Sequence, residues 1–191
     1  SLSEKPHKWP VFSRNRNEIN TVEHIVVLGK KEDIPNTKNI SKKVIAYEDL
    51  IENVSTLNEW PIFSEKTASS LCYTSGTTGN PKGVLYSHRS TLIHTIAAAN
   101  PDSFNLSSLD VIMPIAPMFH ANAWGIPYVA TMIGAKLVLP GRHLDGKSIY
   151  NLMEREKVTF TAAVPTIWLM LFQFLEKEKK KLNYLKSCAI G

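Results

Sequence analysis

LCYTSGTTGNPKGVLYS, residues 71–87, places a loop rich in hydroxyl side chains and glycine between two apolar runs. Its centre, TSGTTGNPK (74–82), holds four hydroxyls, two glycines and one lysine in nine residues. A polyphosphate carries several negative charges, so its site needs many N–H and O–H donors, a cation and backbone that can approach closely. The flanking runs have the residue types of strands. The stretch therefore predicts a phosphate-binding loop that joins two strands.

Each residue type in the loop has a use in holding phosphates. Gly76 and Gly79 let the backbone approach a ligand closely, and Lys82 supplies a positive charge. Pro81 fixes the backbone before Lys82 and reduces the entropy lost when the loop closes on a ligand. We expect the phosphates to be held by Thr74, Ser75, Gly76, Thr77, Thr78, Gly79 and Lys82.

A Walker loop and an ordinary hairpin turn fit these residues less well. The Walker loop, GxxxxGK[ST], has glycine before its lysine and Ser or Thr after it, whereas Pro81 and Gly83 flank Lys82 here. A Walker loop also opens a helix, and residues 83–87 look like a strand. A hairpin turn has a similar composition, but this ordered set of residues is expected by chance at roughly 10⁻⁸ per starting position. The pattern favours phosphate binding over a plain turn or a Walker-type phosphohydrolase.

The composition is that of a globular protein with small anionic partners. The 191 residues are 43% hydrophobic, which is enough to bury a core, and the net charge of +5 suits nucleotides. The lysines are scattered or lie in KEKKKL (177–182), which is expected to be a solvated helix end, with peripheral contact with an anionic membrane as the alternative. No nucleic-acid partner is expected. Two cysteines outside any CxxC pair, with no long apolar segment or signal peptide, predict a cytoplasmic protein without a transmembrane segment.

The chain changes in character near residue 67. Residues 1–66 are polar and lysine-rich, with a strand expected over 22–28 and a short helix over 47–53, and they cannot enclose a core alone. From residue 68 strand-like and helical runs alternate, which is typical of an α/β fold with a layered sheet flanked by helices. The expected strands are 70–74, 83–86, 111–114, 136–139, 158–162 and 186–190.

Capping residues predict where the helices begin. Ser87 is a suitable N-cap for a helix over 88–99, and Asp145 for one over 146–157. Pro165 suits the first turn of a helix that reaches residue 177. A further helix is expected to begin at Trp124 and Gly125.

The segment PMFHANAW (117–124) follows an apolar strand. Its histidine, His120, should lie near the carboxyl end of that strand, where open α/β sheets bind their ligands. The imidazole could bind a carboxylate or line a cleft, although a lone histidine after an apolar run is often structural. The other histidines show no ligand spacing and are expected to be surface or structural residues: His7, His24, His88, His94 and His143.

The loop and three later stretches resemble a known family. YTSGTTGNPKGV (73–84) resembles the phosphate-binding signature of the adenylate-forming (AMP-binding) enzymes, which include acyl-CoA synthetases, luciferases and the adenylation domains of nonribosomal peptide synthetases. PMFHANAW, GAKLVLPG (134–141) and VTFTAAVPTIW (158–168) are most similar to medium- and long-chain fatty acyl-CoA synthetases. The similarity is good over 67–191 and loose over 22–54.

This resemblance implies an ATP-dependent acyl-CoA ligase of the AMP-forming type. Such an enzyme converts a fatty acid and Mg-ATP to acyl-AMP and pyrophosphate, and coenzyme A (CoA) then displaces AMP. Lys82 and His120 are the implied catalytic residues, and Thr78 is the implied contact to Mg²⁺. Amino-acid-activating relatives have Phe-Asp where this chain has Phe119-His120, which indicates a carboxylic acid without an α-amine.

The resemblance also implies which residues contact the substrate acid. His120 would lie beside its carboxylate, and Trp124 and Gly125 could gate or line an acyl tunnel together with Val164 and Pro165. Core packing is the alternative role for the apolar residues among them. The length of the acid stays open, because each buried CH₂ contributes only about 0.8 kcal/mol and pocket depth is a three-dimensional property.

Compared with the domain plan of the family, the chain is expected to be an internal part of the large N-terminal domain. Residues 1–66 would be an incomplete N-terminal portion of the adenylation domain, and 67–191 its nucleotide- and acyl-binding core. The family's later Thr-Glu motif, ribose-binding aspartate, hinge and C-terminal domain are not found in these residues, so the 191 residues alone are expected to be inactive. A nucleotide-binding module without catalysis, or a truncated interaction piece, is the alternative. The thiol acceptor and the oligomeric state, for which a homodimer of the parent is one option, stay open.

Overall fold

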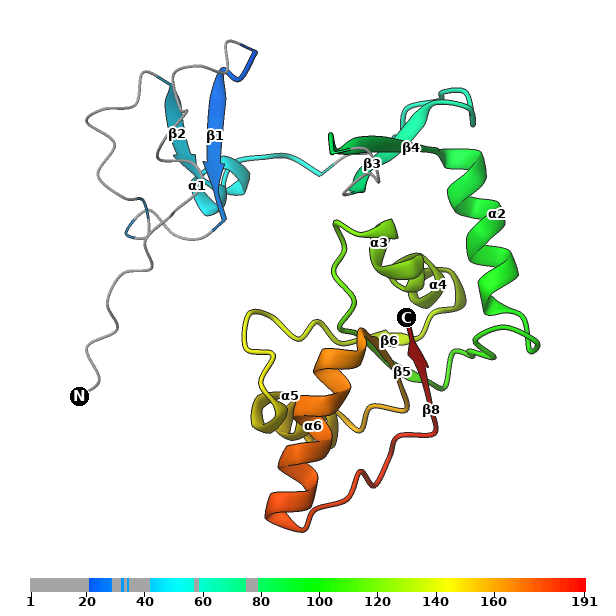
Figure 1. Cartoon of the computed structure of the whole chain (residues 1–191). Coiled ribbons are helices and arrows are strands. Elements are labelled where there is room, and N and C mark those ends of the chain that lie inside the picture. Colours follow the sequence, from blue (N-terminus) through cyan, green and yellow to red (C-terminus); the bar gives the residue numbers. More distant parts are fainter. Residues whose placement is uncertain (1–20, 29–31, 33, 35–41, 57–58, 75–78) are drawn as a thin grey trace. The chain divides into compact units, whose positions relative to one another are not determined.

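A computed structural model describes residues 21–28, 32, 34, 42–56, 59–74 and 79–191 (Figure 1). The contacts between residues group the chain into two compact units, residues 1–61 and residues 62–191. Each unit is described by itself. No helix among the described residues is both long enough and apolar enough to cross a bilayer.

The first unit contains a small parallel sheet. Strands β1 (His24–Val27) and β2 (Lys43–Ala46) pair in parallel, and α1 (Tyr47–Ile51) follows β2 directly. Val27 and Ala46 are buried where the two strands end side by side. The strand expected over 22–28 is confirmed in its central four residues, and the helix expected over 47–53 ends two residues early. The sequence did not reveal β2, because four residues in a lysine-rich region carry little strand signal.

The second unit begins with an antiparallel hairpin. Strand β3 (Ala68–Thr74) pairs with β4 (Lys82–Ser87), and Thr74 lies opposite Lys82 where the hairpin opens into its loop. The expectation that the glycine- and threonine-rich loop joins two strands is confirmed. Ser87 then ends β4 and begins α2 (His88–Ala99), because its hydroxyl accepts the backbone N–H of Ser90 at 3.1 Å.

The rest of the second unit is built on a four-stranded parallel sheet. The spatial order of the strands is β6-β5-β7-β8. After β5 the chain forms β6 on one side of β5, then crosses to form β7 on its other side, and β8 is added next to β7. This reversal creates a topological switch point between β5 and β7, where open α/β sheets bind ligands at the carboxyl ends of the strands. The strands are β5 (Val111–Pro114), β6 (Lys136–Leu137), β7 (Phe160–Ala163) and β8 (Ser187–Ile190).

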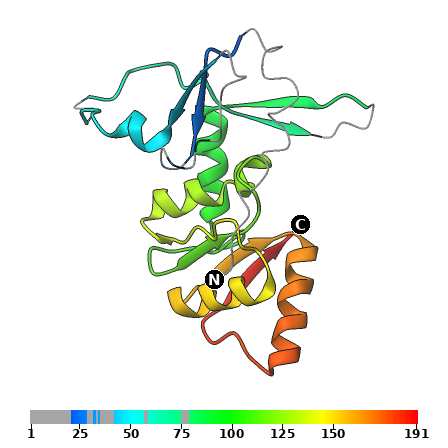
Figure 2. The same cartoon turned by 90° about the vertical axis from the view of Figure 1, so that its left-hand side faces the viewer.

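Helices cover both faces of this sheet. Figure 2 shows α4 (Ile126–Ile133) on one side of the strands and α5 (Gly146–Glu156) with α6 (Pro165–Glu178) on the other. Adjacent residues of β5 point to opposite faces, so Ile112 packs in the cluster under α4 and Met113 in the cluster under α5 and α6. The predicted α/β fold with a helix-flanked sheet is therefore confirmed.

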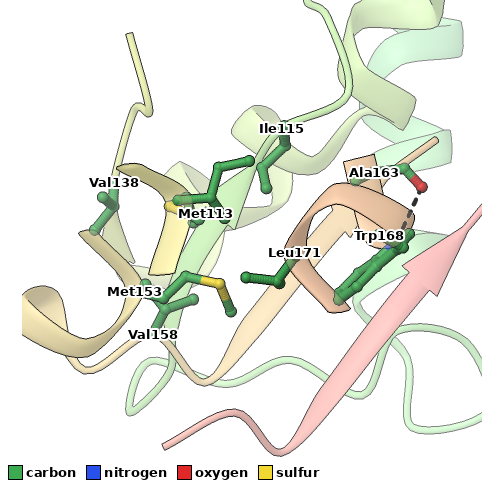
Figure 3. Close-up of a cluster of buried hydrophobic side chains, with 9 residues drawn as sticks. Met113, Ile115, Val138, Met153, Val158, Ala163, Trp168 and Leu171 are labelled. Carbon is green, nitrogen blue, oxygen red and sulfur yellow. Dashed lines mark hydrogen bonds between the residues drawn. The ribbon is translucent and has the colours of Figure 1, made fainter. Parts of the chain in front are cut away.

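The cluster under α5 and α6 fixes the course of the chain after β7 (Figure 3). Trp168 of α6 is buried there and its indole N–H donates to the carbonyl oxygen of Ala163, at 3.2 Å, so the beginning of α6 is held against the end of β7. Helices α5 and α6 approach closely at Gly146, where an added Cβ would lie 2.4 Å from the carbonyl oxygen of Met170. Glycine at the first position of α5 is thus required by packing.

Element ends differ slightly from those expected. Helix α2 and strand β5 have the predicted bounds, while α5 ends one residue early and α6 one residue late. Strand β6 stops at Leu137 instead of residue 139, and β7 runs from Phe160 to Ala163 instead of over 158–162. These shifts leave the order of elements unchanged.

Candidate active site

The phosphate-loop residues that the structure describes lie at the mouth of the β3–β4 hairpin. Thr74 is the last residue of β3 and Lys82 the first of β4, and the Thr74 hydroxyl donates to the Lys82 carbonyl oxygen at a long 3.5 Å. Gly79 has φ +95°, a conformation that favours glycine. The remaining predicted phosphate ligands lie outside the described residues: Ser75, Gly76, Thr77 and Thr78.

The other predicted site residues follow the two central strands at the switch point. His120 comes six residues after the end of β5, is exposed and precedes the short α3 (Ala121–Trp124). Val164 and Pro165 directly follow β7 and begin α6. The backbone N–H groups of Ile115 and Ala116 both donate to Ala162, at 2.9 Å each, so the chain leaving β5 stays beside β7. The two central strands thus lead directly into the segments that hold His120 and Val164.

Residues 121–125 form a left-handed turn. The φ angles are +46°, +52°, +51°, +57° and +72° for Ala121, Asn122, Ala123, Trp124 and Gly125. This left-handed conformation costs roughly 1–2 kcal/mol for each residue with a Cβ. The expectation that Trp124 begins a helix is wrong: Trp124 belongs to the turn, Gly125 is the N-cap of α4, and the helix starts at Ile126.

Two side chains from neighbouring elements bind this turn. The Asn122 amide donates to the Ser70 hydroxyl at 2.9 Å, and its carbonyl oxygen accepts the Cys72 thiol at 3.5 Å, which ties the turn to β3. On the other side, Nε2 of His94 in α2 lies 3.1 Å from the carbonyl oxygen of Trp124. Since a carbonyl only accepts, this contact fixes the His94 tautomer with its proton on Nε2.

Gly125 is required by both conformation and space. Its φ of +72° disfavours any side chain, and an added Cβ would lie 2.5 Å from Cδ2 of His94. The ring of His94 therefore occupies the space that a larger residue would need. His94 is a residue of this site that the sequence did not identify, because it precedes Trp124 by 30 positions on another helix and no spacing rule connects them.

A pocket of about 400 Å³ lies between α2, the left-handed turn and α4. The turn forms one wall through Asn122, Trp124 and Gly125, and His94 and Tyr128 come from the two helices. The Trp124 ring also lies beside Gly191, directly after β8, because a Cβ added to Gly191 would lie 3.2 Å from its Cζ2. The pocket brings together the predicted acyl-contact residues Trp124 and Gly125; His120, Val164 and Pro165 are not among the residues that line it.

Asp110, a carboxylate with a lowered pKa, lies away from the switch point. Burial acts to raise the pKa of Asp110. Hydrogen bonds from Ser107 and Thr159 and the positive charge of Lys186 lower it by more, so the pKa lies below its usual value. Asp110 precedes β5 and is thus at the amino end of the sheet, opposite the candidate site. Over the residues that the structure describes, no three His, Cys, Asp or Glu side chains gather as a metal site would need.

Sequence comparison finds a family match over nearly the whole chain. Residues 11–191 match the family AMP-binding, described as AMP-binding enzyme. This is the family that the loop and the PMFHANAW segment resemble, so the recognition from the sequence is confirmed.

Curated relatives include two acid–CoA ligases. Over 159 residues the chain is 57% identical to the medium-chain-fatty-acid–CoA ligase of Ectopseudomonas oleovorans, which covers 82% of this chain and 29% of that protein. The 3-methylmercaptopropionyl-CoA ligase of Ruegeria lacuscaerulensis is 45% identical over 185 residues, covering 95% of this chain and 33% of that protein. The chain thus spans about a third of the length of these relatives.

A solved structure shares the fold. The crystal structure of the anthranilate CoA ligase AuaEII in complex with anthranoyl-AMP superposes with a TM-score of 0.76, at 24% identity, over 95% of this chain and 34% of that chain. The fold agreement and the match over residues 11–191 lead to one conclusion: the chain belongs to the AMP-binding enzyme family.

Proposed function

We propose that the parent protein of this chain is an ATP-dependent, AMP-forming acid–CoA ligase that acts on a fatty acid. In the first step a carboxylate oxygen attacks the α-phosphorus of ATP, and pyrophosphate leaves. In the second step the CoA thiol displaces AMP from the acyl-AMP. The observation that carries the proposal is the TSGTTGNPK loop between β3 and β4 in a chain that belongs to the AMP-binding family.

The loop would hold the β- and γ-phosphates as the leaving group. Lys82 is exposed at the first position of β4 and Thr74 lies opposite it, so a charge and a hydroxyl stand where the hairpin meets its loop. Positioning and charge stabilisation are what this reaction requires, since the protein forms no covalent bond to the phosphates. The full proposed set is Thr74, Ser75, Gly76, Thr77, Thr78, Gly79 and Lys82, with Thr78 also on Mg²⁺.

His120 would lie beside the substrate carboxylate and the α-phosphate. Its position after β5 at the switch point supports this role, because that edge of an open α/β sheet is the usual ligand site. An aspartate in place of His120 would suit an ammonium group, whereas histidine suits a substrate with only a carboxylate. The names of both curated relatives describe acids without an α-amine, which is consistent with this preference.

The pocket of about 400 Å³ would receive the acyl group. Its volume is in the range of small-molecule sites, and Trp124 and Gly125 form part of its wall. Val164 and Pro165 would contact the substrate from the end of β7. One curated relative is named for a medium-chain fatty acid and the other for 3-methylmercaptopropionate, so we propose an aliphatic acid and assign no chain length. The proposed setting is the cytoplasm, with a homodimer as one option for the assembly.

The test replaces Lys82 by alanine in the intact parent protein. Adenylation, followed as acid-dependent exchange between pyrophosphate and ATP, should fall by about 10² or more, the scale of losing one preorganised charged group. Lys147→Ala is the matched control, because Lys147 is an exposed lysine on α5 and belongs neither to the hairpin nor to the pocket wall. Exchange that is unchanged by Lys82→Ala would refute the assignment of the loop.

A further inference from the structure

The left-handed turn at residues 121–125 is the most strained described backbone beside the pocket, and its own hydrogen bonds are few. Within it, Ala123 N–H donates to the His120 carbonyl at 3.0 Å and Gly125 N–H to the Asn122 carbonyl at 3.1 Å. Four residues with a Cβ hold positive φ in succession, which persists only where surrounding structure fixes it. Something outside the turn must therefore select this conformation.

The Asn122 side chain is suited to that task. Asparagine accepts the left-handed conformation more readily than most residues with a Cβ. Its amide group offers both a donor and an acceptor, and both are used: the N–H₂ binds the hydroxyl of half-buried Ser70 at 2.9 Å and the oxygen receives the thiol of buried Cys72 at 3.5 Å. Because both partners are on β3, the turn is bound to a strand that is itself paired with β4.

The position of this turn decides the shape of the pocket. Asn122, Trp124 and Gly125 line it directly, and the Trp124 ring lies beside Gly191. A turn that relaxed to right-handed geometry would redirect the Trp124 side chain and move Gly125 away from the His94 ring. The pocket wall would then change while the hairpin that carries the phosphate loop kept its pairing.

We propose that Asn122 is a positioning residue for the acid substrate: through Ser70 and Cys72 it holds the left-handed turn so that Trp124 and Gly125 form the pocket wall. This inference rests on the proposed function, since it assigns the pocket to the acyl group. It gives Asn122 no contact with reacting atoms. Its loss should alter recognition of the acid and leave recognition of ATP near normal.

The experiment compares Asn122→Ala, Asn122→Gly and Asn122→Asp in the intact parent protein. KM is measured for a series of saturated acids of increasing length and for ATP. The Asn122→Ala variant should raise the KM for the preferred acid about tenfold, which is about 1.4 kcal/mol, with the KM for ATP changed less than about twofold. In Asn122→Asp the KM for the acid should rise much less than in Asn122→Ala, because a carboxylate accepts hydrogen bonds from both Ser70 and Cys72.

Asn122→Gly separates the hydrogen bonds from the backbone conformation. Glycine adopts positive φ without a penalty, so this variant keeps the turn available and removes only the bonds to β3. We expect it to resemble Asn122→Ala in acid KM. A wild-type acid KM in Asn122→Gly would overturn the role assigned to the side chain.

A double-substitution cycle keeps the inference testable if Asn122→Ala folds poorly. Ser70→Ala removes the partner hydroxyl on β3, and it should raise the acid KM by itself. It should add little to the effect of Asn122→Gly or Asn122→Ala, which have already lost the bond to Ser70. Asn151→Ala, an exposed asparagine on α5, is the matched control. Equal rises in KM for acid and ATP, or fully additive effects of Ser70 and Asn122, would overturn the inference.

The two hypotheses fail in different ways. Without any acid-dependent exchange in the unsubstituted parent, the proposed function is wrong and this inference falls with it. With normal exchange in the parent and an unchanged acid KM in all Asn122 variants, the proposed function stands and the inference alone is wrong.

Discussion

Asp110 joins the amino ends of three strands of the parallel sheet. Its carboxylate accepts the backbone N–H of Ser107 at 2.8 Å and the hydroxyl of Thr159 at 2.8 Å, and Lys186 lies 3.6 Å away. Thr159 precedes β7 and Lys186 precedes β8, while Asp110 itself precedes β5. One largely covered carboxylate thus links the residues that precede three strands.

The lowered pKa of Asp110 makes part of the stability pH-dependent. Burial acts to raise this pKa, but the hydrogen bonds and Lys186 lower it in the folded state. Its stabilising contribution is therefore present above the unfolded pKa, about 3.9, and is lost as pH falls through the lower folded pKa. Asp110→Asn should reduce the free energy of unfolding by about 1–2 kcal/mol at neutral pH and make the loss of stability below about pH 4 less steep.

Denaturant unfolding of the chain at neutral and acidic pH measures both effects. Asp102→Asn, at an exposed aspartate just beyond α2, is the control. It should leave the free energy of unfolding at neutral pH, and its decrease on acidification, nearly unchanged. If the Asp110→Asn variant lost stability on acidification in parallel with the unsubstituted chain, Asp110 would not be the responsible group.

At the residue level, the sequence predicts the groups that are distinctive by type and spacing. The proposed phosphate loop stands out because glycine, hydroxyls and one lysine are unusual together, and His120 and Trp124 belong to a recognisable segment. His94 and Asn122 could not be found in this way. Their roles depend on contacts with Trp124 and Ser70, which lie 30 and 52 positions away along the chain.

Among the elements, α2 connects the phosphate-loop hairpin to the pocket. It follows β4 without a linker and carries His94, so its beginning fixes the distance between the two parts of the candidate site. The junction is a reciprocal cap in which Ser87 accepts from the Ser90 N–H at 3.1 Å and the Ser87 N–H donates to the Ser90 hydroxyl at 3.0 Å. Two otherwise unpaired backbone donors are thereby satisfied.

Removing this cap should loosen α2. Ser87→Ala is expected to lower the free energy of unfolding by about 1 kcal/mol and to speed hydrogen exchange of the first-turn amides of α2. Ser55→Ala, at an exposed serine outside the helices of the first unit, is the matched control. Unchanged exchange in the first turn of α2 would mean that tertiary packing, and not the cap, fixes the start of the helix.

Most helices and strands were predictable because their signals are local. Ser87, Asp145 and Pro165 mark helix starts by chemistry that acts within one turn, and apolar runs mark β5 and β7. The left-handed turn was not predictable. The segment HANAW is rich in alanine, which favours a right-handed helix, whereas contacts with β3 and α2, distant in sequence, help to stabilise the left-handed conformation.

For the molecule as a whole, part of the second unit carries a large apolar surface. The hairpin exposes Leu71, Tyr73 and Leu85, and α2 exposes Leu92, Ile93 and Ile96, all at half or more of their full area. Large apolar side chains exposed on a hairpin and on the helix that follows it are typical of a surface that another part of a protein covers. Because the chain spans about a third of its curated relatives, we expect further residues of the parent to cover it.

The 191-residue chain by itself should therefore bind a hydrophobic dye such as ANS and scatter light more than the intact parent at equal concentration. Replacing Leu85 and Ile93 together by serine should reduce both signals. Leu109→Ser, an isolated exposed leucine in a loop, is the control and should change them little. Equal dye binding by the chain and the parent would show that this surface is not covered in the parent.

The strand order β6-β5-β7-β8 has a consequence for the time course of folding. The hairpin pairs Thr74 with Lys82 across a short loop, whereas β5 and β7 pair residues 48 positions apart. Closing the longer loop costs more chain entropy and delays the contacts that repay it. During synthesis the β3–β4 hairpin can thus form while β7 is still within the ribosome, so we expect the proposed phosphate loop to be in place before the proposed acyl pocket.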